Sequence, residues 1–232
     1  MFTQCPCGHG RLPAWLCCKK PWAPNPVPRH VTVLPGFVDA ALCARLENHL
    51  QSQIGLDLGV MDVTKSSQGA VAITQSDNRV TTELDVMAVQ GELDDLVSRA
   101  CSDIIPQRYT SEVEWFERPK VLSYREGGLY ASHADSEQHD PKTDSWTRVL
   151  DRDISLILYL NDQFDGGFLD FHFFNYRYTP RAGDLVMFPS DHRYVHEATK
   201  VTAGHRLAVV SWLALQGTDR VRDRPPKNVR KP

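Results

Sequence analysis

The second half of the chain, from about residue 118, alternates short apolar stretches with Gly, Pro, Asp and Asn. Seven such stretches stand out, at residues 120–126, 129–135, 153–161, 168–175, 184–189, 194–200 and 205–215. Short strands at this spacing are typical of a β-sandwich or barrel. No helical period separates the stretches, which argues against a sheet built from repeated strand–helix–strand units.

The preceding region shows two amphipathic helical patterns instead. Apolar positions recur at helical spacing over residues 40–52, and Asp39 just before them can cap the first turn. A second helix is predicted over residues 91–105, where Pro106 ends the pattern. Residues 51–90 show only weak alternation. We therefore expect a mainly β barrel with supporting helices on its N-terminal side.

The first 20 residues carry a separate signal. Cys5, Cys7, Cys17 and Cys18 lie within 14 residues and flank a glycine-containing loop. Paired thiolates at both ends of a short loop suit a tetrahedral zinc site. The stretch CPCGHGRLPAWLCC resembles the SEC-C zinc motif, and by that resemblance the four cysteines hold one structural Zn(II). The alternative is a tail without metal, in which these cysteines fall together by chance.

Proline content and charge predict the remaining boundaries between segments of the chain. Residues 21–29 contain four prolines and predict an extended, semi-rigid linker. The main domain is then expected over residues 30–216. Residues 217–232 contain six Lys or Arg, two Asp and three Pro, and we expect a basic flexible tail there. An arm for an acidic partner is the alternative for this tail.

Overall composition excludes several classes of protein. The 232 residues are 41% apolar and 24% charged, which fits a soluble globular protein and excludes bulk disorder. No stretch approaches the roughly 20 apolar residues of a membrane-spanning helix. The N-terminus MFTQCPCGHG has no basic and apolar regions typical of a secretion signal, so we expect a cytoplasmic protein. A net charge of −3 gives no strong nucleic-acid signal.

Candidate chemistry lies in three of the predicted strands. His133 and Asp135 are two residues apart at a strand end, so both side chains can point to the same face. His196 lies in a later strand, and Arg206 begins the strand after it. Two His and one carboxylate are the ligand set of the non-haem Fe(II) oxygenases, which leaves positions open for cosubstrate and O2. A buried Arg offers a bidentate partner to a carboxylate.

Several motifs in this order resemble the Fe(II)/2-oxoglutarate dioxygenases, specifically their prolyl 4-hydroxylase-like branch. The matching text is YREGGLYASHAD, then YLNDQFDGGFLDF, then TPRAGDLVMFPSDHRYVHEATKVTAGHRLAVVSW, and it spans roughly residues 118–214. The resemblance implies a double-stranded β-helix (jelly-roll) barrel. It also implies an enzyme that uses Fe(II), 2-oxoglutarate and O2, with ascorbate as a further cofactor found in such enzymes.

The resemblance also assigns roles to residues. It implies that His133, Asp135 and His196 bind Fe(II) and that Arg206 binds the distal carboxylate of 2-oxoglutarate. Tyr124 and Tyr159 match positions whose hydroxyls hydrogen-bond the cosubstrate, although both can equally be core aromatics. The implied reaction converts 2-oxoglutarate to succinate and CO2 and hydroxylates an unactivated C–H.

The sequence leaves the substrate open. We expect a prolyl or other residue in a protein or peptide, because the N-terminal zinc motif favours a macromolecular partner. The alternatives are a free amino acid or other small molecule, a non-catalytic metal-binding recognition module, and a cupin-like metalloenzyme without a cosubstrate. The polar loop 136–151 is either a substrate lid or a solvated connection.

Overall fold

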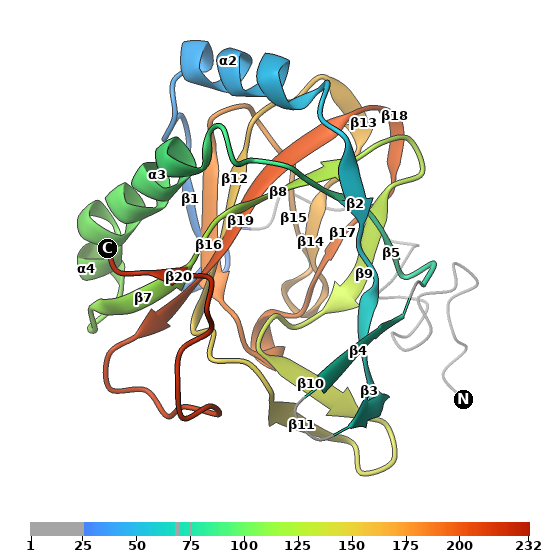
Figure 1. Ribbon diagram of the computed structural model, residues 1–232, viewed down its shortest axis with the longest axis vertical. Coiled ribbons are helices and arrows are strands. Elements are labelled where there is room, and N and C mark those ends of the chain that lie inside the picture. The colour runs from blue at the N-terminus through green and yellow to red at the C-terminus, as the bar shows by residue number, and fades with distance from the viewer. Residues whose placement is uncertain (1–25, 68–69, 75) are drawn as a thin grey trace.

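The computed structural model describes residues 26–67, 70–74 and 76–232, and two β-sheets dominate it (Figure 1). The strands of the larger sheet are Thr32–Leu34 (β1), Gly55–Asp57 (β2), Thr82–Leu84 (β6), Val113–Glu117 (β7), Lys120–Tyr124 (β8), Ile154–Tyr159 (β12), Leu185–Pro189 (β16), Arg206–Leu215 (β19) and Val229–Arg230 (β20). They run in the order β1–β16–β12–β19–β8–β6–β2, with β7 also paired to β19 and β20 paired to β7.

The smaller sheet faces the larger one across an apolar interior. Its order is β15–β14–β17–β9–β5, and the paired strands in it are antiparallel. Its strands are Arg79–Val80 (β5), Leu129–His133 (β9), Leu169–Phe171 (β14), Tyr176–Tyr178 (β15) and His196–Ala198 (β17). Two hairpins, one further strand pair and two 3-10 turns complete this half. The hairpins are Val60–Ser67 (β3) with Ala70–Thr74 (β4) and Glu137–Asp140 (β10) with Ser145–Arg148 (β11). The strand pair is Phe164–Gly166 (β13) with Val201–Gly204 (β18), and the turns are His172–Phe174 (η1) and His192–Tyr194 (η2).

Alternation along β12 divides the core into two clusters. Leu156 and Leu158 belong to the cluster on the helix side, whereas Ile157 and Tyr159 belong to the cluster between the sheets. Successive side chains of a strand point to opposite faces, so a strand covered on both faces is apolar at nearly every position. This explains the almost continuous apolar stretch in β12, and all six of its residues are buried.

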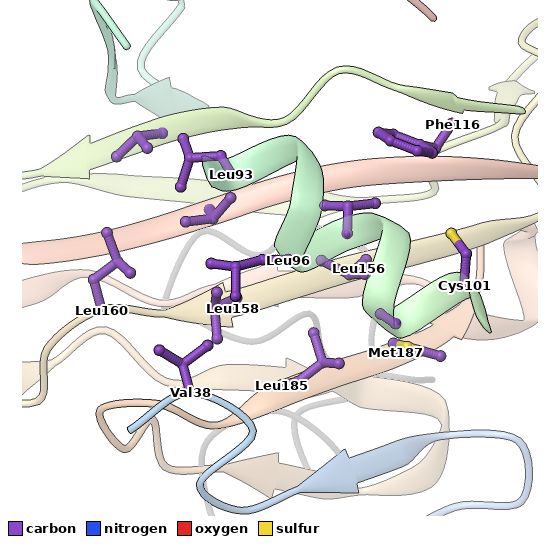
Figure 2. Packing of buried hydrophobic residues seen from close by; sticks show 14 of the residues in the cluster. Val38, Leu93, Leu96, Cys101, Phe116, Leu156, Leu158, Leu160, Leu185 and Met187 are labelled. Atoms are coloured by element: carbon purple, nitrogen blue, oxygen red, sulfur yellow. The ribbon is translucent and has the colours of Figure 1, made fainter. Parts of the chain in front are cut away.

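The helices cover the outer face of the larger sheet (Figure 1). They are Ala40–Leu50 (α2), Gln90–Asp103 (α3) and Ile105–Arg108 (α4). Figure 2 shows α3 lying over β12 and β16, where Leu93 and Leu96 pack against Leu156, Leu158 and Leu185. Each fully buried leucine contributes about 1.5–3 kcal/mol of transfer free energy, so this face fixes the helices on the sheet.

The predicted helix termini are confirmed in one case and need correction in the other. The side chain of Asp39 accepts a hydrogen bond from the Leu42 N–H at 2.8 Å, so it caps α2 as predicted. The second helix ends at Asp103 rather than at residue 105. Pro106 does not stop it but lies in the first turn of α4, where the missing N–H has no partner to lose.

The seven predicted apolar stretches all contain strands, which confirms the mainly β fold expected from the sequence. The stretch 168–175 is only partly extended, because β14 ends at Phe171 and the chain continues as η1. The weak region 51–90 contains five short strands, β2 to β6.

The expectation of a flexible tail over residues 217–232 is wrong. Val229–Arg230 forms β20 on the edge of the larger sheet, and Figure 1 shows the C-terminus beside α3 and α4. Arg230 contacts the fully buried Asp94 of α3 at 3.1 Å. The tail buries little apolar surface, but hydrogen bonds and ion pairs hold it in place. Amino-acid composition indicates how much apolar surface a segment can bury, but it does not reveal the hydrogen bonds and ion pairs that the segment makes.

The predicted zinc motif, residues 1–20, lies outside the described residues, as do residues 21–25 of the linker. The zinc site therefore stays a prediction. Among the helices of the described residues, none has the length and apolar character needed to cross a membrane.

Candidate metal and cosubstrate site

Three predicted ligands meet between the two sheets. The donor atoms of His133, Asp135 and His196 all lie within 4.8 Å of one another, and no other such cluster occurs in the part of the chain that the structure describes. The His133 Nε2 atom lies 3.7 Å from one carboxylate oxygen of Asp135, and the His196 Nε2 atom lies 3.6 Å from the other. The two histidines are directly paired across β9 and β17, which brings residues 63 positions apart to one point.

The same local contact orients both imidazole rings. The Nδ1 atom of His133 lies 2.8 Å from the carbonyl oxygen of Ala131, and that of His196 lies 3.1 Å from the carbonyl oxygen of Tyr194. A carbonyl only accepts hydrogen bonds, so each Nδ1 carries the proton and each Nε2 keeps its lone pair. Both Nε2 atoms are therefore ready to bind a metal.

Two serines and an arginine hold Asp135 through its side chain and its backbone. The Ser155 hydroxyl donates to its Oδ2 atom at 2.6 Å, and the Ser155 and Ser190 hydroxyls are 2.8 Å apart. The backbone N–H groups of Asp135 and Ser136 both donate to the Ser190 carbonyl. Arg152 donates to the Asp135 carbonyl at 3.3 Å. Sequence reasoning missed both serines, which carry no motif of their own.

Electrostatics holds Asp135 and His196 in their metal-binding forms. Burial favours the neutral form of Asp135, but His196, His133 and Arg152 outweigh it and hold the pKa of this carboxyl well below its usual range. Burial and the neighbouring His133 lower the pKa of His196 from 6.5 to about 4, against the opposing effect of Asp135. At neutral pH the site therefore offers an anionic carboxylate and neutral imidazole.

A buried guanidinium lies deeper between the sheets. Arg206 is 2% exposed, and its Nε and Nη1 atoms have no hydrogen-bond partner. The guanidinium lies 4.6 Å from the Tyr124 ring centre and 5.2 Å from that of Tyr159. The Tyr159 hydroxyl is also buried without a partner. Buried donors are almost always satisfied, so this group of unmet donors indicates a missing acceptor such as a carboxylate.

A β-bulge adds an aromatic residue that sequence reasoning missed. Tyr130 pairs with Ala198 and His133 with His196, so three steps along β9 match two along β17. Strict alternation would place Tyr130 on the face opposite His133. The bulge instead allows their rings to stack, with centres 3.6 Å apart and planes inclined by 19°.

The open side of the site is lined by a second aromatic residue. Trp212 is partly exposed and pairs across the sheet with Ser155, the residue that holds the iron-ligand candidate Asp135. The Arg152 guanidinium lies 3.6 Å from the centre of the Trp212 ring. It also makes a bidentate ion pair with Glu117, at 2.5 and 2.9 Å.

The loop 136–151 has more structure than the sequence indicated. It forms the hairpin β10–β11, in which Trp146 stacks on His192 with ring centres 5.6 Å apart. The Nδ1 atom of His192 lies 2.6 Å from a carboxylate oxygen of Glu137. These contacts fold the loop back against η2, just ahead of His196.

Comparison with known proteins accounts for this arrangement. Residues 119–214 match the 2OG-Fe(II) oxygenase superfamily, and the match contains all three ligand candidates and Arg206. This segment is therefore similar to the 2OG-Fe(II) oxygenases, and it makes up less than half of the chain.

Proteins similar to this chain include hydroxylases. A PKHD-type hydroxylase from Teredinibacter turnerae is 39% identical over 100 residues, which are 41% of this chain and 42% of that protein. The alignment thus spans less than half of the relative's length. The fold resembles a viral collagen prolyl hydroxylase from Paramecium bursaria Chlorella virus-1, with a TM-score of 0.56, 17% identity, and coverage of 79% of this chain and 95% of that one. It also resembles a Pseudomonas putida prolyl-4-hydroxylase, with a TM-score of 0.53, 22% identity, and coverage of 82% and 94%.

Every predicted site residue that the structure describes belongs to one of two clusters. His133, Asp135 and His196 form one cluster, and Arg206 forms another with Tyr124 and Tyr159. The predicted zinc ligands Cys5, Cys7, Cys17 and Cys18 lie outside the described residues. The donor set of the first cluster fits Fe(II), and the unmet donors of the second fit a dicarboxylate cosubstrate.

Proposed function

We propose that this chain is an Fe(II)- and 2-oxoglutarate-dependent dioxygenase that hydroxylates an unactivated C–H of a prolyl or other residue in a protein or peptide. One observation carries the proposal: a His-Asp-His cluster and a buried guanidinium with unmet donors both lie between the two sheets. A metal-binding recognition module has no use for that guanidinium. Neither does a metalloenzyme that works without a cosubstrate.

Each residue has a defined task in this proposal. His133, Asp135 and His196 would hold Fe(II) on one face and leave the opposite positions open. Arg206 and Tyr159 would donate hydrogen bonds to the distal carboxylate of 2-oxoglutarate. Oxidative decarboxylation coupled to C–H hydroxylation is the chemistry that the bound metal and cosubstrate supply.

The protein also keeps water from the reacting centre. Arg206 and Tyr159 are both almost fully buried, so the cosubstrate carboxylate would meet fixed donors in a poorly solvated pocket. A guanidinium in such surroundings binds a carboxylate more strongly than it does in water. Its fixed position orients the cosubstrate toward the three ligands.

The open side of the site supports a residue with an apolar ring as the substrate. Tyr130 and Trp212 are partly exposed aromatic side chains, one stacked on the ligand candidate His133 and the other beside Ser155. A prolyl ring is apolar and rigid, and it packs well on aromatic faces at little entropic cost. The likeness to hydroxylases described as acting on collagen and on prolyl residues supports the same substrate class.

The test is a turnover assay on the full chain with Fe(II), 2-oxoglutarate, O2 and a library of proline-containing peptides. We expect succinate release that depends on peptide, together with a peptide mass gain of one oxygen atom. His133→Ala and Asp135→Ala should abolish both signals, whereas His49→Ala, an exposed histidine on α2, should leave them unchanged. Succinate release driven by free amino acids but by no peptide would overturn the proposed substrate class. Unchanged turnover in His133→Ala would overturn the proposed reaction.

A further inference from the structure

The C-terminal segment contacts both neighbours of Arg152 in the chain. We call residues 217–230 the C-terminal strap. The buried carboxylate of Asp151 accepts hydrogen bonds from the backbone N–H groups of Val221 at 2.6 Å and Arg222 at 3.2 Å. The strap is thereby attached to the backbone immediately before Arg152.

The strap is also attached immediately after Arg152. One carboxylate oxygen of Asp153 accepts from the Thr218 hydroxyl at 2.9 Å and from Arg220 at 3.3 Å. The same oxygen accepts from the Leu215 N–H at 2.8 Å. Arg220 continues to Glu114 on β7 at 2.6 Å, so these ion pairs link the strap to the larger sheet.

The end of the strap pairs with the strand that carries the ion-pair partner of Arg152. In β20, Val229 lies directly opposite Glu117 of β7, and the Arg118 N–H donates to the Asn228 carbonyl at 2.7 Å. Glu117 is the carboxylate that holds Arg152 through two hydrogen bonds. The strap therefore supports Arg152 at the residue before it, the residue after it and the partner of its side chain.

Arg152 in turn lies beside the candidate metal site. Its guanidinium packs against the partly exposed Trp212 and donates to the backbone carbonyl of Asp135, one of the three ligand candidates. An arginine side chain has many rotamers, and holding it in one requires support from its surroundings. The pairing of β20 with β7 already covers the sheet edge. The contacts to Asp151 and Asp153, on either side of Arg152, are additional to it.

We propose that the C-terminal strap positions Arg152 for substrate binding, with Asp151 as the positioning residue that transmits its effect. This inference rests on the proposed function, because it assigns Arg152 to the substrate side of the oxygenase site. Arg152 donates to the backbone carbonyl of Asp135 and not to its carboxylate, so loosening the strap should leave the metal-binding atoms of His133, Asp135 and His196 and the guanidinium of Arg206 in place.

The first test is a double-mutant cycle measured on the full chain with a hydroxylated peptide. Asp151→Asn removes the charge that accepts the two strap N–H groups. It should raise the KM for the peptide about tenfold, with the KM for 2-oxoglutarate and peptide-independent succinate release unchanged. In an Arg152→Lys background, Asp151→Asn should raise the KM for the peptide little further, because the guanidinium through which it acts is absent. Asp165→Asn, which removes an exposed carboxylate on β13, should have no effect in either background.

The second test does not depend on turnover. The Nε–H group of Arg152 gives an NMR signal that is identified by its loss in Arg152→Lys, and we expect it to exchange slowly with water in the wild-type protein. Asp151→Asn should accelerate that exchange about tenfold while the melting temperature stays within a few degrees. Equal effects of Asp151→Asn on the peptide KM in both backgrounds, or unchanged Nε–H exchange, would refute the strap's role. If no peptide is hydroxylated by the wild type, the proposed function fails on its own, and the exchange measurement still decides the role of the strap.

Discussion

Replacing Arg206 by Met should stabilise the protein in the absence of cosubstrate and abolish its stabilisation by 2-oxoglutarate. Arg206 is one of the largest fully buried side chains, and its Nε and Nη1 atoms lack partners. Met has a similar length, fills irregular space and needs no hydrogen bonds. The two effects have opposite signs, which separates the carboxylate-binding role from an ordinary structural role.

The magnitude follows from the surroundings of the guanidinium. Each unmet buried donor costs about 1–3 kcal/mol. The aromatic faces of Tyr124 and Tyr159 at 4.6 and 5.2 Å offset this cost by about 0.5–2 kcal/mol. A net gain of about 1–3 kcal/mol for Arg206→Met raises the melting temperature by a few degrees in a chain of this size. With cosubstrate at about 100 times its Kd, the wild type should gain about 2.7 kcal/mol and the variant nothing.

The assay is anaerobic thermal unfolding by calorimetry, with Mn(II) in place of Fe(II), with and without 2-oxoglutarate. Arg181→Met provides the control, since Arg181 is exposed and should keep the full cosubstrate shift. The reasoning is refuted if Arg206→Met melts below the wild type without cosubstrate and keeps the cosubstrate shift. That outcome would mean that the guanidinium is satisfied in the free protein and does not meet the carboxylate.

Three further predictions test other parts of the structure. Ser155→Ala removes the hydroxyl that holds Asp135 and should raise the Fe(II) Kd about 10–100-fold in a metal titration; an unchanged Kd would contradict this support. Gly183→Ala should lower stability in urea unfolding by at least about 3 kcal/mol, because Gly183 has φ +82° and an added Cβ would meet the Val38 carbonyl oxygen; a loss below about 1 kcal/mol would refute it. Burial raises the pKa of Cys101 to about 12, so the folded thiol stays protonated at pH 9 and should be alkylated at least about 100-fold more slowly than after unfolding, by peptide mass spectrometry; equal rates would contradict it. The same shift makes its contribution to stability complete below pH 9 and lost as the pH rises toward 12.

The ligand candidates could be predicted because their signal is local in the sequence. His133 and Asp135 follow the alternation of one strand, and the apolar stretch of β12 shows that it is buried on both faces. The order of the family motifs along the chain then assigned His196 and Arg206 to the same site. The apolar pattern therefore sufficed for the mainly β fold, whereas the metal and cosubstrate roles of these residues came from the resemblance to a known family.

The remaining features depend on contacts between distant parts of the chain. The position of Tyr130 follows from a bulge in the pairing of β9 with β17, which alternation within β9 does not reveal. The C-terminal segment looks disordered by composition, yet its hydrogen-bond acceptors Asp151 and Asp94 lie 70 and 136 residues earlier. Ser155 is significant only because folding places it beside Asp135.

The strand β19 carries two residues of the candidate site and fixes the distance between them. Arg206 begins this strand, and Trp212 lies on the same side of it six residues later, about 20 Å away at the usual rise of a strand. Three neighbouring strands, β8, β12 and β7, lock its register. A single inserted residue between the two positions would turn the tryptophan toward the helices, and an inserted pair would lift it by roughly 7 Å. The number of residues between Arg206 and Trp212 thus fixes the distance between these two side chains. A natural variant can therefore change the side chains of this segment more freely than its length.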